Sequence, residues 1–323
     1  MIRCWHADGA GVRDVTPAEA VRLALEGPGS VWIDFDSEPA DSVTAVLAPL
    51  GIHPLVLEDL VADVNRPKVD SYGAYLYLVV HSARWDDDRP LLREIDIVIG
   101  RRFLITHHEG NTRSVDTAQQ VLGRRPDLLG RGPATLMHYL LDVLVDHWLP
   151  IVDQIGEELD GLEETLFSAP DGALHQRILR LKRGMSALRR IIGPQRDTVL
   201  ALTRDEFEPV PAEMRPYLRD VFDRLARVSD LLDSFRDETA ALLELHVSQV
   251  SNQLNEVIKR LTVIATIGMP LTIVTSYYGM NVGPERIFPE FHWLRVHPVF
   301  VVWLLLAAMT VATWWYLKRR RWM

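Results

Sequence analysis

Two long stretches without a formal charge lie near the end of the 323-residue chain and limit what it can fold into. "LTVIATIGMPLTIVTSYYG" covers residues 261–279, and "VHPVFVVWLLLAAMTVATWWYL" covers 296–317. A helix of about 20 apolar residues spans the hydrocarbon of a bilayer. The second stretch is rich in aromatic residues near its end and stops at "KRRR", as a membrane interface requires. We therefore predict two transmembrane helices rather than the buried hairpin of a soluble core.

The same stretches set the expected topology. Lysine and arginine are enriched on the cytoplasmic side of membranes, so we expect the basic tail at 318–323 to be cytoplasmic. Two crossings return the chain to its starting side, which places residues 1–260 in the cytoplasm and the loop 280–295 outside. The first residues lack the apolar core of a signal peptide. We expect a multi-pass protein of the cell (inner) membrane with both termini in the cytoplasm.

Composition narrows the range of functions. The formal net charge of −9 argues against a nucleic-acid partner, because phosphate binding requires a basic surface, and it favours the attraction of cations. Cys4 is the only cysteine, so neither a disulfide nor a cysteine zinc site can form within one chain. The sequence contains no "GxxxxGK" phosphate loop and no "HExxH" or "GxSxG" motif. We therefore predict no enzymatic activity.

Residues 1–132 have the pattern of a cytoplasmic α/β domain. Short runs rich in Val, Ile and aromatic residues predict strands, and they lie at 30–36, 75–83, 94–100 and 102–108. "TPAE" at 16–19 is a capping box with proline at the first helical position, so we expect a helix to begin after Thr16. "HPLVLEDLV" at 53–61 predicts another helix. The expected domain is a small mixed sheet flanked by helices.

From residue 133 the strand pattern stops, and we predict a region of long stalk helices over 133–260. Helical patterns occur at 133–168, 171–204 and 211–279, and the breaks are "SAPDG" and "EPVPAE". The third pattern is far longer than an ordinary globular helix. It predicts one stalk helix that continues into the first membrane span.

A heptad repeat marks the first half of this third helix. Its members are Val221, Leu225, Val228, Leu232, Phe235, Thr239, Leu242 and His246. Such a seam indicates a helix packed along neighbours, and it would offer lateral contacts in a ring of copies. Acidic residues repeat at sevens beside it, at Asp223, Asp230, Asp237 and Glu244. We interpret them as a solvated face; the alternative is a column of carboxylates that concentrates divalent cations.

One face of the first span differs from a plain membrane anchor. Steps of three or four residues bring together Asn255, Ile258, Leu261, Ala265, Met269, Thr272 and Ser276. The face is polar at both ends and apolar in the middle, which is the pattern of a pore wall with an apolar constriction. A single threonine in a membrane helix is more often satisfied by its own backbone or a neighbouring helix. Two helices cannot enclose a pore, so this interpretation requires a ring of identical chains.

The chain resembles a known family at these positions. "YGMN" at 278–281 follows a threonine-rich apolar helix and precedes a "PE" loop, a second span and a basic tail. This arrangement resembles the CorA magnesium transporter family, and "SNQLNEVIKRLTVIATIGMPLTIVTSYYGMN" is similar to its stalk-to-pore helix throughout. "RPKVD" and "LREIDIVIGRRFLITHHE" are similar to its cytoplasmic part, so the resemblance covers essentially the full chain. It implies an α+β membrane protein: a funnel-shaped homopentamer whose first membrane helix lines the pore.

The resemblance also implies a role for each pore residue. Gly279, Met280 and Asn281 match the family's selectivity signature, and Asn281 would form the ring that meets the incoming ion. Further inward, Thr272 and Ser276 would be hydrogen-bonding rings; the family commonly has glycine at the Ser276 position. The remaining assignments are an apolar gate at Met269 and Leu261, a polar ring at Asn255, and cation attraction to the external mouth by Glu285 and Glu290.

Regulation is a second implication of the resemblance. Mg²⁺ bound between the cytoplasmic domains of adjacent chains would hold the funnel closed. The candidate ligands are the acidic turn Asp86, Asp87 and Asp88 and, by its position relative to the pore helix, Asp220. Without the resemblance, "WDDDRP" indicates a solvated hairpin turn. The implied function is Mg²⁺ influx down its electrochemical gradient, with Co²⁺ and Ni²⁺ as further substrates and Mg²⁺ itself as the regulator.

Two other functions remain open. One is a Zn²⁺ transporter of the ZntB type in the same superfamily, in which the middle residue of the signature usually differs from Met280. The other is a membrane-anchored scaffold, which would not need a polar face through its first span. "HHE" at 107–109 is interpreted as structural or exposed rather than as a metal site. His138 and Asp142, with Asp146 on the same helix face, are interpreted as a surface pair at i,i+4 spacing.

Overall fold

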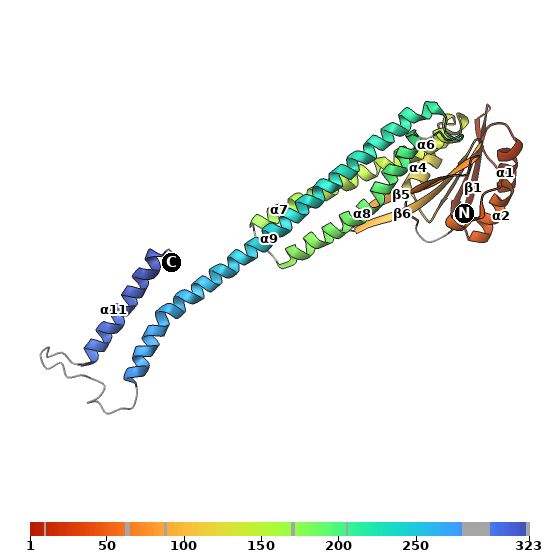
Figure 1. The fold of residues 1–323 in the computed structure, drawn as a ribbon. Coiled ribbons are helices and arrows are strands. Elements are labelled where there is room, and N and C mark those ends of the chain that lie inside the picture. The colour runs from red at the N-terminus through yellow and green to blue at the C-terminus, as the bar shows by residue number, and fades with distance from the viewer. Residues whose placement is uncertain are drawn as a thin grey trace. The chain divides into compact units, whose positions relative to one another are not determined.

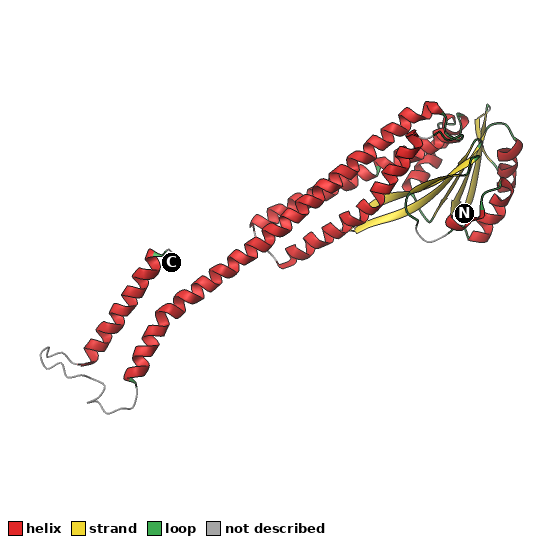
Figure 2. Cartoon of the chain, viewed as in Figure 1, coloured by secondary structure: helices red, strands yellow, loops and turns green. Residues whose placement is uncertain are grey.

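Figures 1 and 2 show a computed structural model of the protein. It describes residues 1–9, 11–61, 65–86, 89–168, 172–204, 206–279 and 298–320. The chain divides into two compact units, Met1–Leu243 and Glu244–Met323. Some predicted site residues lie outside the described ranges: Asp87, Asp88, Met280, Asn281, Glu285 and Glu290.

A seven-stranded mixed sheet forms the centre of the first unit, in the order β2-β1-β3-β7-β6-β5-β4. The strands are β1 (Ile2–Asp8), β2 (Gly11–Asp14), β3 (Ser30–Asp36), β4 (Lys68–Ser71), β5 (Tyr75–Asp86), β6 (Arg89–Gly100) and β7 (Phe103–His108). Strands β3 and β7 pair in parallel, and all other neighbours are antiparallel. The mixed sheet is confirmed, whereas β1, β2 and β4 were not predicted.

Helices cover both faces of this sheet (Figure 1). One face is covered by α1 (Pro17–Glu26), α2 (Ala40–Leu47) with the short η1 (Ala48–Leu50), and α3 (Pro54–Asp59). The other carries α4 (Arg113–Leu122), α5 (Asp127–Gly130) and α6 (Pro133–Asp146). The predicted cap is confirmed, since the Thr16 hydroxyl accepts a hydrogen bond from the Glu19 N–H.

Alternation along β5 shows why both faces can be covered. Leu76, Leu78 and Val80 join the core beneath α4–α6, while Tyr77 and Val79 join the core beneath α1–α3. Side chains in a strand point to opposite faces in turn, so an uninterrupted apolar strand serves two cores at once. All five side chains are fully buried.

Three long helices extend from the α/β part: α7 (Trp148–Ser168), α8 (Gly172–Arg204) and α9 (Arg215–Tyr278), with the short η2 (Ala212–Met214) before α9. The predicted helix over 133–168 is wrong as a single element, because α6 ends at Asp146 and α7 begins at Trp148. Pro150 explains the break: it has no N–H to donate to the Asp146 carbonyl, and proline is tolerated only in the first turn of a helix.

The heptad seam of α9 is buried within its own chain. Leu225, Val228, Leu232 and Leu242 belong to the same apolar core as the inner faces of α7 and α8. The expected lateral contacts between copies through this seam are therefore wrong, because the seam is already covered inside one protomer. The acidic column beside the seam is exposed, in agreement with a solvated face: Asp223, Asp230, Asp237 and Glu244.

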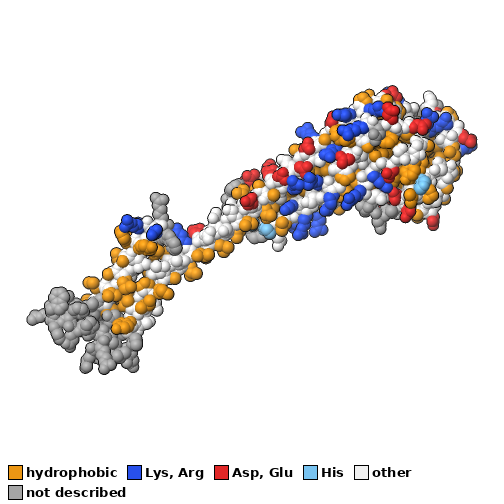
Figure 3. Space-filling view, viewed as in Figure 1, with side chains coloured by type: hydrophobic (Ala, Val, Ile, Leu, Met, Phe, Trp, Pro, Cys, Tyr) orange, Lys and Arg blue, Asp and Glu red, His pale blue; other side chains and the backbone are white. Residues whose placement is uncertain are grey.

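The second unit consists of the end of α9 and of α11 (Pro298–Arg319). Its described surface is dominated by apolar side chains, seen in orange in Figure 3. Leu261, Ile264 and Met269 are each exposed by more than 60%, as are Phe300 and Leu304 of α11. A soluble monomer rarely exposes so continuous an apolar surface, so this unit requires a lipid or protein environment.

Candidate functional site

The C-terminal part of α9 is the candidate transport element. Within the described residues, one helix is long and apolar enough to cross a membrane, and none of its apolar window is buried. The predicted pore-lining residues all lie on this helix with exposed side chains: Asn255, Leu261, Met269, Thr272 and Ser276. At 3.6 residues per turn their spacing places them along one face.

The four threonine hydroxyls of the span are anchored to the backbone of their own helix. Thr272 Oγ1 donates to the carbonyl of Gly268 at 2.9 Å. Thr262, Thr266 and Thr275 make the same bond to the carbonyl four residues earlier. Each hydroxyl proton is thereby used, and each oxygen keeps lone pairs that can accept a further hydrogen bond. A threonine on the face predicted to line a pore can therefore act as an acceptor.

Pro270 and Gly279 shape the backbone at the end of the span. Pro270 lies inside α9 and cannot donate to the carbonyl of Thr266, so one helical hydrogen bond is missing beside Thr272. The Gly279 N–H donates to Thr275 at 2.9 Å, and α9 ends at Tyr278. A Cβ on Gly279 would lie 3.0 Å from the Thr275 carbonyl oxygen, which favours glycine at this position.

Helix α11 ends in three consecutive cation–π pairs. Lys318 Nζ lies 4.9 Å from the ring centre of Trp314, and the guanidinium of Arg319 lies 5.3 Å from that of Trp315. Arg320 makes the equivalent contact with Tyr316 at 5.9 Å. Aromatic rings and basic groups at a helix end anchor it at the boundary between lipid and water.

The proposed regulatory residues lie in two places. Asp86 is exposed at the end of β5 and pairs in register with Arg89, as the hairpin interpretation of "WDDDRP" requires. Asp220 lies near the start of α9, and its carboxylate is 3.1 Å from the guanidinium of Arg224.

Arg224 is a functional candidate that the sequence interpretation missed. Its guanidinium bonds Asp146 at 2.7 Å, and it also contacts Asp142 and Asp220. Asp142 therefore bonds across to α9 rather than serving mainly as a surface partner of His138. The sequence contained one signal of this cluster, because Asp142–Asp146 and Asp220–Arg224 both have the i,i+4 spacing of one helix face.

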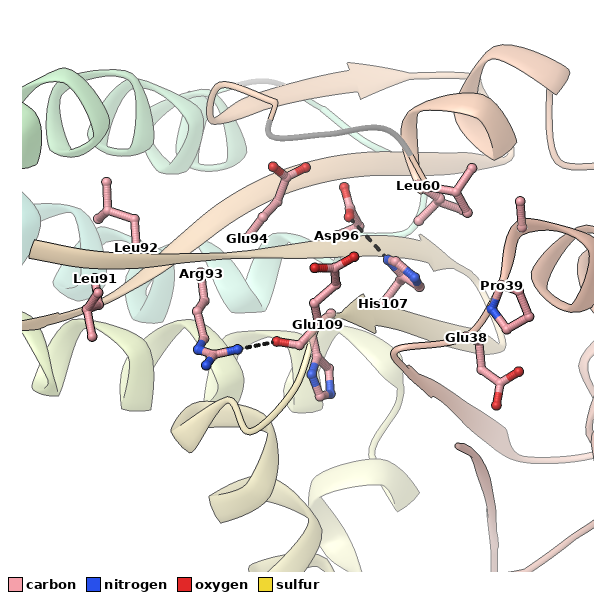
Figure 4. A pocket seen from close by; sticks show the side chains of 13 residues that line it. Glu38, Pro39, Leu60, Leu91, Leu92, Arg93, Glu94, Asp96, His107 and Glu109 are labelled. Carbon is pink, nitrogen blue, oxygen red and sulfur yellow. Dashed lines mark hydrogen bonds and ion pairs between the residues drawn. The ribbon is translucent and has the colours of Figure 1, made fainter.

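A hollow of about 470 Å³ opens beside β6 and β7 (Figure 4). Its lining includes Glu94, Asp96 and His107, and the side chain of Glu109 lies near them. Asp96 is 4% exposed, accepts from the Tyr77 hydroxyl at 2.7 Å and lies 3.6 Å from His107 Nδ1. Burial raises the pKa of Asp96. The Asp96 carboxylate is therefore already satisfied by its neighbours.

Glu94 has its own set of partners at this hollow. Both of its oxygens accept from Asn65, one from the backbone N–H at 2.6 Å and one from the side-chain amide at 3.0 Å. Burial, followed by the charge of Asp96, raises the pKa of Glu94 to about 7. His81 Nε2 lies 3.7 Å from the carboxylate, and burial lowers the pKa of His81 to about 4.

The two histidines of "HHE" are buried and structural. His107 faces Asp96, and His108 lies 3.4 Å from Asp34. Although burial opposes the charge, the bond to Asp34 raises the pKa of His108. Among the residues that the structure describes, no three His, Cys, Asp or Glu side chains are grouped so that they could hold a metal ion.

Comparison with known proteins identifies the class of protein. A family model described as "CorA-like Mg2+ transporter protein" matches residues 28–319. The chain therefore belongs to the CorA family of divalent-cation transporters, and the resemblance read from "YGMN" and its surroundings is confirmed.

Individual relatives agree on the family and differ in the ion they name. The cobalt/magnesium transport protein CorA of Thermotoga maritima is 32% identical over 312 residues, covering 95% of this chain and 88% of the relative. The putative metal ion transporter YfjQ of Bacillus subtilis is 31% identical over 90% of this chain and 89% of its own. The zinc transport protein ZntB of Yersinia pestis is 23% identical over 100% of this chain and 96% of its own.

Solved structures share the whole fold. The CorA magnesium transporter of Methanocaldococcus jannaschii has a TM-score of 0.84 at 17% identity, covering 100% of this chain and 99% of that one. Full-length CmaX has a TM-score of 0.78 at 22% identity, covering 99% and 97%. The expected α+β fold with an N-terminal α/β part and a long helix is confirmed.

Proposed function

We propose that this protein is a homopentameric channel that admits hydrated Mg²⁺ to the cytoplasm down its electrochemical gradient. The observation that carries the proposal is the exposed face of α9, on which Asn255, Thr272 and Ser276 flank the apolar Leu261 and Met269. Five such faces around one axis would form a bore that is polar at its ends and apolar between them. Helix α11 would be the outer span, with Lys318–Arg320 at the cytoplasmic interface.

The chemistry of the face suits an ion that keeps its water. Mg²⁺ dehydrates reluctantly, and the waters of its first shell present protons outward. Thr272 Oγ1 accepts such protons, because its own proton is held by the Gly268 carbonyl. The amide oxygen of Asn281, with Gly279 and Met280 in the selectivity signature, would act in the same way at the outer entrance. Amide and hydroxyl oxygens bind the shell without a full charge, so the ion can leave again.

The membrane potential supplies the driving force. A divalent ion that crosses about 100 mV gains about 4.6 kcal/mol, twice the roughly 2.3 kcal/mol for one charge. This supports an inward concentration ratio of more than about a thousandfold, since about 1.4 kcal/mol corresponds to tenfold. Glu285 and Glu290 would raise the cation concentration at the external mouth.

Cytoplasmic Mg²⁺ would close the channel by binding between copies. The ligands that we propose are Asp220 on α9 of one copy and the hairpin carboxylates Asp86, Asp87 and Asp88 of the next. Few carboxylates with several retained waters make a weak site, as a sensor of cellular Mg²⁺ requires. Asp220→Asn should leave transport intact and remove most of the inhibition by internal Mg²⁺.

Ion uptake into proteoliposomes tests the function directly. The uptake of Mg²⁺, Co²⁺, Ni²⁺ and Zn²⁺ is compared in one preparation of the full chain under the same membrane potential. The Asn281→Ala variant is measured in parallel. We expect Mg²⁺, Co²⁺ and Ni²⁺ uptake that Asn281→Ala abolishes while the oligomer stays intact in cross-linking. Uptake of Zn²⁺ alone would favour the ZntB type, to which the chain is similar over its full length. If no ion is taken up, the channel proposal fails and the membrane-anchored scaffold is the remaining hypothesis.

A further inference from the structure

Three carboxylates from two helices converge on one guanidinium. Asp142 and Asp146 project from α6, and Asp220 and Arg224 project from α9. Arg224 Nη1 donates to Asp146 at 2.7 Å, while Nη2 contacts Asp142 and lies 3.1 Å from Asp220. The Arg224 side chain is 25% exposed and that of Asp142 33%, whereas Asp146 and Asp220 are 59% and 72% exposed, so only the pair with Asp142 is partly shielded from water. Partly buried charge pairs of this kind are screened less than surface pairs.

The charges in this cluster are not balanced. Three carboxylates face a single positive charge, so a net negative potential remains around Arg224. The cluster can therefore accept a second positive charge, and a cation that approaches Asp220 competes with Arg224 for the same oxygens.

The guanidinium and a divalent cation need different arrangements of the carboxylates. Arginine spreads its partners around a planar fork, whereas Mg²⁺ gathers oxygens at about 2.1 Å in an octahedron. In the described part of the chain no three acidic or imidazole groups are close enough together for a metal. The carboxylates are thus arranged as the guanidinium of Arg224 requires, and not as Mg²⁺ requires.

We propose that Arg224 is a built-in competitor of the regulatory divalent cation and sets the internal Mg²⁺ concentration at which the channel closes. The inference rests on the proposed role of Asp220 in regulation. While Arg224 pairs with the Asp220 carboxylate, Mg²⁺ must either displace Arg224 from Asp220 or bind more weakly through its remaining ligands. Arg224 is a positioning residue in this scheme: it acts through Asp220 and does not touch the transported ion.

Removing the competitor should tighten the regulatory site. We expect Arg224→Gln to lower the internal Mg²⁺ concentration for half-maximal inhibition by about tenfold in proteoliposomes of the full chain. Arg224→Lys keeps the charge and loses the fork, so its shift should be smaller and in the same direction. The matched control is Arg227→Gln, which removes the same charge from the exposed surface of α9 one turn away and should shift the midpoint by less than about twofold.

A second measurement distinguishes a regulatory role of Arg224 from a purely structural one, in which Arg224 only holds α6 against α9. The melting temperature of the full chain in detergent is titrated with MgCl₂. A purely structural Arg224 predicts a lower melting temperature without metal and an unchanged Mg²⁺ midpoint in Arg224→Gln, and that result would overturn the proposal. A tenfold lower midpoint, reproduced in direction by Arg224→Lys, would support it.

Asp220→Asn distinguishes failure of this inference from failure of the regulatory role. If Asp220→Asn removes Mg²⁺ inhibition and Arg224→Gln shifts nothing, the competition is wrong and the regulatory site stands. If Asp220→Asn leaves inhibition unchanged, the regulatory role of Asp220 fails, and the role of Arg224 fails with it.

Discussion

Gly156 of α7 faces the ring of Phe235 in α9 so closely that a Cβ on the glycine would lie 3.2 Å from Phe235 Cζ. Phe235 belongs to the heptad seam, so this contact fixes how α9 packs on α7. Gly156→Leu should lower the free energy of unfolding by about 1–3 kcal/mol, the usual cost of overpacking a core. Thermal unfolding of the full chain in detergent measures the change.

Gly161 on the same helix provides the control. A Cβ on Gly161 would meet nothing within 4 Å. Gly161→Leu should therefore be neutral or stabilise the chain by about 0.5–1 kcal/mol, through the better helix propensity of leucine. Equal effects of leucine at the two positions would show that Gly156 is not in a close contact.

Thr272→Val tests the acceptor role of the proposed pore face. Valine has the shape of threonine without the oxygen, so the proposed bore would keep its width while each copy would lose one hydrogen-bond acceptor. We expect Mg²⁺ uptake to fall about tenfold, equivalent to about 1.4 kcal/mol. Thr266→Val is the matched control, because Thr266 makes the same backbone bond and lies about a third of a turn around the helix from Thr272. A comparable loss in both variants would assign the effect to helix stability.

Glu94 should give the cytoplasmic unit a measurable pH dependence. Its pKa is raised from 4.5 to about 7, first by burial and then by Asp96. Between these values the unfolded chain releases the proton and the folded chain keeps it, so stability falls as pH rises from about 4.5 to about 7. Glu94→Gln cannot release this proton.

The difference in the free energy of unfolding between Glu94→Gln and the natural chain should therefore shift in favour of the variant by up to about 3 kcal/mol from pH 4 to pH 8, at about 1.36 kcal/mol per pKa unit. Melting temperatures of both proteins across this range provide the measurement. His81 is present in both, so its own titration largely cancels in the comparison. A difference that does not change with pH would contradict the raised pKa of Glu94.

Cys4 should be inert in the folded protein. It is 4% exposed, and burial raises the pKa of its thiol to about 12. Because the thiolate is the reactive form, labelling by a maleimide at pH 8 should be slower than for an ordinary thiol by about a thousandfold. Mass spectrometry with and without urea checks this, and rapid labelling of the native chain would disprove the burial. As the only cysteine, Cys4 then reports unfolding of β1.

Elements whose signal is local were predicted well from the sequence. The capping box at Thr16, the apolar runs that became β3 and β7, and the length of α9 each depend on neighbouring residues alone. Strands β2 and β4 have four residues each and are exposed or half-buried. They exist because a neighbouring strand offers hydrogen bonds, which no local pattern reveals.

Partners across the fold were the harder part. The heptad of α9 correctly indicated a buried face, but periodicity does not say whether the neighbour belongs to the same chain, and here α7 and α8 cover it. Arg224 and Asp142 are 82 residues apart in sequence, so their contact appears only when α6 lies beside α9. His107 and His108 lie beside carboxylates on other strands, Asp96 and Asp34, and these contacts were hidden from the sequence for the same reason.

Helix α9 runs for 64 residues without interruption, from Arg215 to Tyr278. Pro270 lies inside this helix and cannot donate to the carbonyl of Thr266, so a bend in α9 costs least at this turn. Alanine at position 270 would restore the missing donor and stiffen the helix two residues before Thr272.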